Sequence, residues 1–314
     1  MQDTVLLTYA APPRLTEALA KRYTVLGPMA SMSPGDLPSG SQQVRAMVTK
    51  GGLPIGPELL DALPALEIIL CYGTGYDLID LQAAKARGIR ITNAGDANAA
   101  AVAEFAITLM LAGVRQLLPY DRMVRSDNWT DQARSAMCLS PGLVGRRLGI
   151  YGLGAIGRQA AKRAQALDME VGYCGRAPHA DSPFQWYPSV QALAEWADVL
   201  LVSVRAGSYN RHAIDKEVLK ALGQQGFLVN ISRGYVVNES DLIEALAEDV
   251  IAGAGLDVFE HEPLVPEALR NDDRVLLAPH IAPHTDHAQN RMRDCLLANL
   301  DAFFKGVSLT GIIV

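Results

Sequence analysis

The stretch Leu148-Gly-Ile-Tyr-Gly-Leu-Gly-Ala-Ile-Gly157 decides the fold of this chain. An apolar run leads into three glycines with the spacing Gly-x-Gly-x-x-Gly, and a helical pattern follows from Arg158 to Leu167. The first glycine suits a tight turn, the second lets the backbone approach a phosphate, and the third allows close helix packing. The N-terminus of the following helix favours negative phosphates. This arrangement predicts that a dinucleotide contacts Gly152, Leu153, Gly154, Ala155, Ile156 and Gly157.

Apolar runs and amphipathic stretches alternate on both sides of this loop, which predicts an α/β fold with parallel sheets. The series around the loop has strands at Leu148 to Tyr151, Glu170 to Cys174, Val199 to Val204, Phe227 to Ile231, Ile251 to Leu256 and Val275 to Leu277, with helices between the first five. An earlier series has strands at Val5 to Tyr9, Val44 to Thr49, Leu66 to Cys71 and Ile89 to Thr92, with helices at Leu15 to Arg22, Leu59 to Leu63 and Leu78 to Arg87. The sequence therefore predicts two doubly wound domains.

The segment between the two series predicts one long buried helix from Ala97 to Leu117. A polar, irregular arm from Tyr120 to Gly145 follows it and contains Trp129. The last helical stretch, Thr285 to Phe304, comes after the second series and can pack back on the first domain. We therefore expect one domain of residues 1–98 and 285–314 and a dinucleotide-binding domain of residues 99–284.

Composition excludes several classes of protein. The chain of 314 residues, 49% of them hydrophobic, exceeds the usual size of a single core, and its net charge is −6 with both signs intermixed. No basic stripe offers a nucleic-acid site, and no apolar run is long enough to span a bilayer. The N-terminal residues lack a secretory pattern, so we expect a cytoplasmic protein. The four cysteines have no metal-type spacing and predict neither a disulfide nor a zinc site.

The second strand of the dinucleotide domain ends in Tyr173-Cys-Gly-Arg176. An acid at this position would hold the ribose hydroxyls of NAD, and a base would accommodate the 2′-phosphate of NADP. The acid is missing, Gly175 opens space, and Arg176 and His179 can pair with a phosphate. We expect NADP(H), with NAD(H) possible. In the alternative interpretation Arg176 faces solvent and Asp181 binds the ribose.

Three polar residues follow strands of the same domain, where open α/β sheets bind ligands. They are Arg233 in Asn230-Ile-Ser-Arg-Gly234, Glu262 in Asp257-Val-Phe-Glu-His-Glu-Pro263 and His280 in Ala278-Pro-His-Ile281. Reduction of a 2-oxo acid requires a cation for the carboxylate, a proton donor for the carbonyl oxygen and a hydride. A guanidinium grips a carboxylate with two hydrogen bonds, and an imidazole donates a proton near neutral pH. We assign these roles to Arg233 and His280, with Glu262 orienting the imidazole.

These motifs together resemble the D-isomer-specific 2-hydroxyacid dehydrogenase family, and within it the glyoxylate and hydroxypyruvate reductases. The resemblance covers nearly the whole chain and includes the loop Cys71-Tyr-Gly-Thr-Gly-Tyr-Asp77. It implies a flavodoxin-like substrate domain and a Rossmann cofactor domain, an active site in the cleft between them, and a homodimer formed through the segment 97–145. It also implies that Asp257 approaches the nicotinamide amide. Substrate contacts are expected at Gly52, Leu53, Thr74, Gly75, Arg233 and His280, and further cofactor contacts at Ser203, Val204, Ile231 and Ser232.

Some residues depart from the family pattern and leave alternatives open. Ile281-Ala-Pro-His-Thr285 replaces a run of small residues, so Pro283 and His284 put the substrate preference in question. Arg205 replaces a proline or small residue and either touches the cofactor or faces water. The histidines at 280, 284 and 287 do not predict a metal, because His280 has another role. Other functions compatible with this fold are a cofactor-sensing interaction protein of the corepressor type and a formate or phosphite dehydrogenase.

Overall fold

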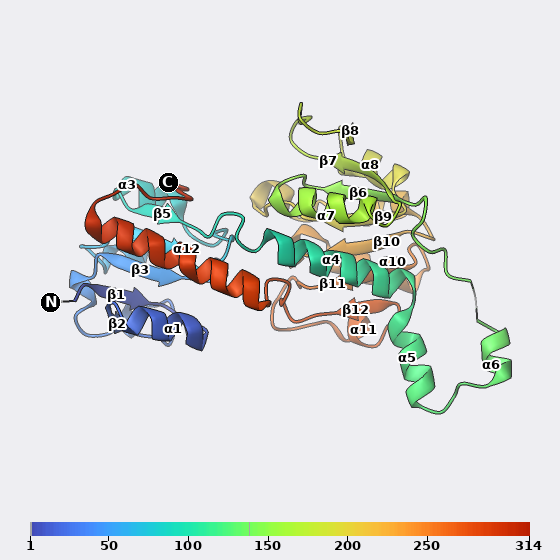
Figure 1. Cartoon of the computed structure of the whole chain (residues 1–314), viewed down its shortest axis with the longest axis horizontal. Coiled ribbons are helices and arrows are strands. Elements are labelled where there is room, and N and C mark those ends of the chain that lie inside the picture. The colour runs from blue at the N-terminus through green and yellow to red at the C-terminus, as the bar shows by residue number, and fades with distance from the viewer. Residues whose placement is uncertain (1, 138) are drawn as a thin grey trace. The chain divides into compact units, whose positions relative to one another are not determined.

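The chain forms two compact units in the computed structural model, which describes residues 2–137 and 139–314. One unit comprises Met1–Asn98 and Thr285–Val314, of which residue 1 is not described, and the other comprises Ala99–His284. Each unit is built on a parallel sheet with helices on both faces (Figure 1). The α/β fold class predicted from the alternation of strands and helices is therefore confirmed.

The first unit contains a five-stranded parallel sheet with the order β2-β1-β3-β4-β5. Its strands are β1 (Thr4–Leu7), β2 (Thr24–Leu26), β3 (Ala46–Thr49), β4 (Ile68–Cys71) and β5 (Arg90–Thr92). Its helices are α1 (Pro13–Ala20), α2 (Pro57–Asp61), α3 (Leu81–Ala86) and α12 (Asp286–Lys305). This strand order is the flavodoxin-like one, in which ligands bind beyond the carboxyl ends of the strands.

Two apolar clusters hold the first unit together, one on each face of its sheet. On one face α1 and α12 contribute fully buried leucines, among them Leu15 and Leu300, which pack against strand residues such as Val48. On the other face α2 and α3 cover the sheet through residues such as Leu59 and Ala84. Each fully buried leucine contributes about 1.5–3 kcal/mol relative to an exposed one. The docking of α12 explains why the C-terminal segment belongs to the first unit.

The second unit contains a seven-stranded parallel sheet with the order β12-β11-β10-β9-β6-β7-β8. Its strands are β6 (Arg147–Tyr151), β7 (Glu170–Cys174), β8 (Gln185–Tyr187), β9 (Val199–Val202), β10 (Phe227–Asn230), β11 (Gly253–Leu256) and β12 (Val275–Leu277). The order reverses beside β6, which is the first strand of the unit, and this is the Rossmann topology with one added strand. The glycine-rich loop thus lies at the point where ligands bind in open sheets.

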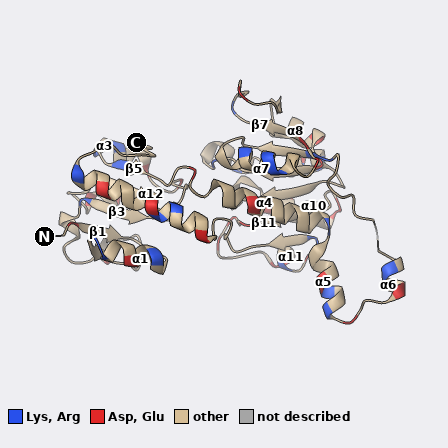
Figure 2. Ribbon diagram, viewed as in Figure 1, with Lys and Arg blue, Asp and Glu red and all other residues tan. Residues whose placement is uncertain are grey.

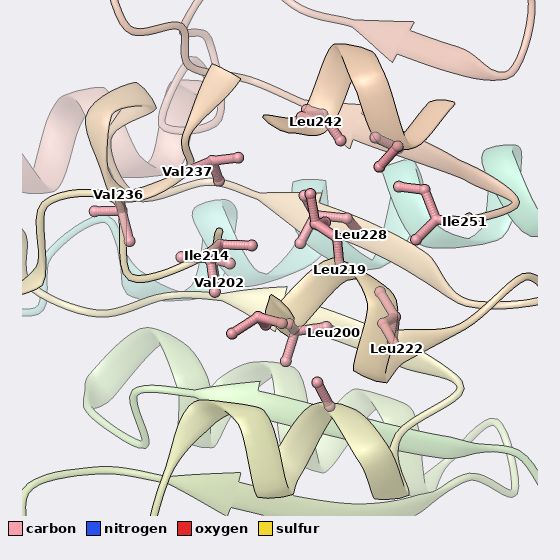
Figure 3. Close-up of a cluster of buried hydrophobic side chains, with 14 of the residues drawn as sticks. Leu200, Val202, Ile214, Leu219, Leu222, Leu228, Val236, Val237, Leu242 and Ile251 are labelled. Carbon is pink, nitrogen blue, oxygen red and sulfur yellow. The ribbon is translucent and has the colours of Figure 1, made fainter. Parts of the chain in front are cut away.

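Helices cover both faces of the second sheet. On one face, α4 (Ala99–Val114) and α7 (Ala155–Gln165) pack against apolar strand residues. On the other face, α8 (Val190–Trp196), α9 (Lys216–Leu222) and α10 (Glu239–Ala247) enclose the cluster in Figure 3, where Leu200 and Leu228 of the sheet lie among Leu219, Leu222 and Leu242. Both basic and acidic residues occur on the helices in the view of Figure 2, for example on α12.

The first part of the second unit differs from its prediction. The long helix ends at Val114, because Gln116 takes a left-handed conformation with φ 51°. The chain then bends by 61° into α5 (Leu117–Arg125), and a short α6 (Asp131–Ser135) follows. The arm that the sequence described as irregular therefore contains two helices, and Figure 1 shows them projecting from their unit. Among the described residues no single helix could cross a membrane; only the bent pair α4 and α5 reaches the required length and apolarity together.

Two short edge strands were not expected from the sequence. β2 and β8 lie at the edges of their sheets and have three residues each. Because they are so short, neither has the apolar run that marks a buried strand in a sequence. β8 contains Trp186 and Tyr187, and the indole N–H of Trp186 donates to the carbonyl of Gly175 at 3.3 Å. Cys71, Cys174 and Cys295 are free thiols, and Cys138 lies outside the described residues.

Candidate active site and cofactor loop

The three glycines of the loop after β6 have distinct environments. Gly152 has φ +105°, and a Cβ on it would lie 2.7 Å from the backbone nitrogen of Val204. Gly154 caps the start of α7 and has open space where a Cβ would be. A Cβ on Gly157 would lie 2.2 Å from the carbonyl oxygen of Gly152, so only glycine permits this helix packing. The open position above Gly154 and the free N-terminus of α7 fit the pyrophosphate of a dinucleotide.

The neighbouring strand ends complete this loop. The hydroxyl of Ser203, after β9, donates to the carbonyl of Gly152 at 2.8 Å, and the backbone N–H of Ser203 donates to the backbone carbonyl of Tyr151 at 2.9 Å. Val204 then lies against the glycine turn. Ile231 and Ser232 follow β10 and are almost completely buried. These residues line the carboxyl edge of the sheet on the side expected for the cofactor.

The end of β7 bears on which cofactor fits. Arg176 is exposed and has no ion-pair partner among the described residues. The backbone N–H of His179 donates to the hydroxyl of Tyr173 at 2.6 Å, and the two rings are 5.7 Å apart. Asp181 instead forms an ion pair with Arg158 of α7 at 3.1 Å. The carboxylate that could hold a ribose is therefore occupied by a neighbour, whereas the guanidinium after β7 is available for a phosphate.

Arg233, Glu262 and His280 follow β10, β11 and β12, which are adjacent in the sheet. Because all three strands are parallel, their carboxyl ends meet at one edge. The imidazole Nδ1 of His280 lies 2.8 Å from Oε2 of Glu262, and both side chains remain partly exposed. The structure thus brings together the three residues that the sequence grouped.

Glu262 is held as a carboxylate. Burial alone would raise its pKa, but the hydrogen bond and charge of His280 hold the pKa below the usual range of a glutamate. The N–H of Phe259 donates to Oε1 at 3.2 Å, and the charge of Arg233 acts in the same direction. An ionised Glu262 at Nδ1 stabilises a protonated imidazole and leaves Nε2 to exchange a proton with a ligand.

A turn fixes Arg233 after β10. Asn230 accepts hydrogen bonds from the N–H and hydroxyl of Ser232 at 3.0 and 3.1 Å, and its amide donates to the carbonyl of Arg233 at 3.1 Å. The following Gly234 permits a close backbone approach, since a Cβ there would lie 1.8 Å from the carbonyl carbon of Phe259. The turn with the guanidinium therefore packs directly on the loop that ends in Glu262.

Asp257 has a role that sequence reasoning missed. It is 1% exposed, and its two carboxylate oxygens accept the backbone N–H groups of Ile281 and Ala282 at 2.8 and 3.0 Å. Burial raises its pKa, and these two bonds act in the opposite direction. His280, which directly precedes Ile281, has φ 55°, a left-handed backbone conformation that residues other than glycine adopt at a cost. Asp257 therefore helps to hold the histidine in place.

We predict that Asp257→Asn destabilises the second unit and slows catalysis. Asparagine keeps only one acceptor oxygen, so one of the two N–H groups loses its partner, at a cost of about 1–3 kcal/mol. Urea unfolding measures the loss of stability, and kcat measures the displacement of His280. Wild-type stability in the variant would contradict this role of the carboxylate.

Gly52, Leu53, Thr74 and Gly75 lie together at the carboxyl edge of the first sheet, after β3 and β4. The two loops touch through their backbones, since a Cβ on Gly51 would lie 2.1 Å from the carbonyl oxygen of Gly75. The amide of Asn93 donates to the carbonyl of Thr74 at 2.7 Å and holds that loop. These contacts bring the two loops together at one edge of the first sheet.

No group of three histidine, cysteine or acidic side chains in residues 2–137 and 139–314 could hold a metal ion. The arrangement of the second unit is that of a dinucleotide-binding oxidoreductase with a histidine, a carboxylate and a guanidinium beside the cofactor edge.

Comparison with known proteins agrees with this class. The model of the D-isomer specific 2-hydroxyacid dehydrogenase NAD-binding domain matches residues 107–282. A glyoxylate/hydroxypyruvate reductase from Arabidopsis thaliana is 39% identical over 299 residues, which cover 93% of this chain and 92% of the relative. A 2-ketogluconate reductase from Gluconobacter oxydans is 37% identical over 297 residues, which cover 95% of this chain and 94% of the relative. The crystal structure of an NADPH-dependent glyoxylate/hydroxypyruvate reductase from Sinorhizobium meliloti, in complex with NADP and malonate, has a TM-score of 0.92, with 34% identity over 100% of this chain and 97% of its own.

The chain belongs to the D-isomer specific 2-hydroxyacid dehydrogenase family. It is an oxidoreductase with a nicotinamide cofactor, as its sequence predicted.

Proposed function

We propose that the protein reduces a small 2-oxo acid, such as glyoxylate or hydroxypyruvate, to the D-2-hydroxy acid with NADPH. The observation that carries this proposal is the meeting of Arg233, Glu262 and His280 at three adjacent strand ends, with Glu262 and His280 in hydrogen-bond contact at 2.8 Å. The names of the relatives, which include reductases of glyoxylate, hydroxypyruvate and 2-ketogluconate, support the same class of substrate.

Each member of the trio has one task in this proposal. Arg233 binds the substrate carboxylate through two parallel hydrogen bonds and orients the carbonyl. His280 donates the proton on Nε2 to the carbonyl oxygen, and Glu262 holds the imidazole at Nδ1 and stabilises its charge. NADPH, bound along the glycine loop, supplies the hydride. Because reduction uses the protonated imidazole and oxidation the neutral one, the two directions should depend on pH in opposite ways.

Backbone groups of Gly52, Leu53, Thr74 and Gly75 are proposed to bind the remaining part of the substrate. Gly52 has open space around its Cα, and Leu53 is partly exposed beside it, which suits contact with a small molecule. Pro283 and His284 follow the catalytic histidine and are proposed to influence which 2-oxo acid is preferred.

The preference for NADPH rests on the end of β7. Arg176 and His179 are proposed to bind the 2′-phosphate, Gly175 leaves room for it, and Asp181 is paired with Arg158. Asp257, whose carboxylate holds the segment after His280, stays a predicted neighbour of the nicotinamide amide.

We predict that Arg176→Ala weakens NADPH binding about tenfold to a hundredfold and leaves NADH binding nearly unchanged, because one charge-assisted pairing with a phosphate is worth about 1.5–3 kcal/mol. Dissociation constants from cofactor fluorescence measure the effect without turnover. Lys162→Ala, in α7, serves as the matched control for loss of a positive charge. Equal losses for both cofactors in Arg176→Ala would contradict a contact with the 2′-phosphate.

The proposed reaction is tested by initial rates at 340 nm with glyoxylate, hydroxypyruvate, pyruvate, 2-ketogluconate and phenylpyruvate, each with NADPH and NADH. Fast consumption of NADPH with at least one small 2-oxo acid supports the proposal. Tight cofactor binding without turnover of any of these acids would overturn it and favour a cofactor-sensing interaction protein.

We also propose that the protein is a homodimer. The projecting arm exposes large apolar side chains: Leu117, Leu118, Val124, Trp129, Leu139 and Val144. Trp129 is 61% exposed, so most of its side chain is not covered by its own chain. Exposed apolar surface of this kind is typical of contact with a partner. A cytoplasmic location is proposed as well, since the described cysteines are free thiols.

A further inference from the structure

The loop that carries Glu262 bears a second carboxylate two residues earlier, at Glu260. The side chain of Glu260 is only 11% exposed, and its Oε1 lies 2.8 Å from Nε2 of His212. The same oxygen accepts a hydrogen bond from Arg211 at 2.5 Å. The loop therefore contacts two histidines, His280 through Glu262 and His212 through Glu260.

His212 connects this carboxylate to the turn of Arg233. Its backbone N–H donates to the carbonyl of Tyr235 at 2.8 Å, and Tyr235 lies two residues after the guanidinium. The backbone N–H of Glu260 donates to Oε1 of Glu239, at the start of α10, at 3.2 Å. Side chain and backbone of Glu260 thus tie together three segments, those of residues 211–212, 233–239 and 258–263.

Two features make this junction sensitive to small displacements. His212 has φ 54°, a left-handed conformation that persists in a residue other than glycine only where its surroundings fix it. Gly234 and Phe259 are in close backbone contact, so one loop cannot move without the other. A displacement at Glu260 would therefore reach both Arg233 and Glu262.

We propose that Glu260 and His212 form a positioning pair that holds Arg233 and Glu262 in register with each other for proton transfer at His280. This inference rests on the proposed function, because it assigns the pair to the same reaction. Neither residue touches the reacting atoms; the pair acts through the loop on which Glu262 lies and the turn on which Arg233 lies.

The charges around Glu260 favour its ionised carboxylate. Arg211 and His212 lie on one side of Glu260, and Glu239 and His261 lie on the side of α10. Burial alone would raise the pKa of Glu260, but His212 and Arg211 hold it below its usual range. Burial and the charge of Glu260 raise the pKa of Glu239, which shows that the two carboxyl groups lie close together.

The test compares Glu260→Ala, Glu260→Gln and His212→Gln in the full-length protein. Glu260→Ala is expected to lower kcat about tenfold to a hundredfold, as misplacement of catalytic groups by about 1 Å can do. KM and the NADPH dissociation constant should change little. Glu260→Gln and His212→Gln each retain a hydrogen-bonding group at the junction, so both should keep most of the wild-type kcat.

Glu267→Gln, a carboxylate replaced in α11 (Glu267–Arg270), is the matched control and should behave like the wild type. The melting temperature of every variant distinguishes a loss of folded structure from a displacement of Arg233 and Glu262 in a folded protein. A lower melting temperature with wild-type kcat and KM for the folded enzyme would overturn the inference, since it would show a purely structural role. Absence of turnover in the wild type would instead refute the proposed function.

Discussion

Replacing His280 by asparagine is expected to lower kcat for glyoxylate reduction about a thousandfold, within the range that general acid catalysis contributes. Asparagine tolerates the left-handed conformation at this position, where φ is 55°, so the backbone should keep its course. It has no group that transfers a proton near neutral pH, so Glu262 would have no acid to support. Steady-state rates at 340 nm measure the effect.

The cofactor dissociation constant should stay near its wild-type value in this variant, because the glycine loop is untouched. His287→Asn, an exposed histidine in the first turn of α12, is the matched control and should retain full activity. A His280→Asn enzyme with more than a tenth of the wild-type kcat would remove the histidine from the proton transfer.

Arg233→Ala is expected to lower kcat/KM about a thousandfold, because truncating one partner of a close charge pair costs about 2–5 kcal/mol. KM should rise as well as kcat fall, since the substrate carboxylate is bound in the ground state and in the transition state. Arg233→Lys keeps the charge but loses the paired geometry of the guanidinium, so it should recover only part of the activity.

The control for this experiment is Arg270→Ala in α11, which removes an exposed guanidinium that is not part of the trio. Substrate-range measurements add a second readout. If Arg233→Ala lowers the rates for glyoxylate and for a neutral aldehyde equally, the guanidinium does not recognise the carboxylate, and the assignment is wrong.

The fold could be predicted from the sequence because its signals are local. The apolar run before Gly152, the three glycines and the helix after them lie within a short stretch, and the other strands repeat the same alternation. Predictions were less accurate where tertiary contacts determine the local backbone structure. Three-residue edge strands such as β2 carry too few apolar residues to be recognised, and the break at Gln116 depends on one left-handed residue in an otherwise helical stretch.

The site was predictable to the extent that strand ends identify it. Arg233, Glu262 and His280 each follow a recognisable strand, and their adjacency follows from the strand order. The roles of Asp257 and Glu260 could not be predicted, because they depend on which backbone N–H groups and side chains lie opposite. The alternation Glu260-His-Glu262 was a signal for two carboxylates on one loop, but the sequence does not show which partner each one meets.

The most direct test of the central claim is the chirality of the product. Hydroxypyruvate and NADPH are incubated with the enzyme, and the glycerate formed is resolved on a chiral column and counted against the NADPH consumed. We expect one D-glycerate for each NADPH oxidised. Formation of L-glycerate, or oxidation of NADPH without glycerate, would contradict the account.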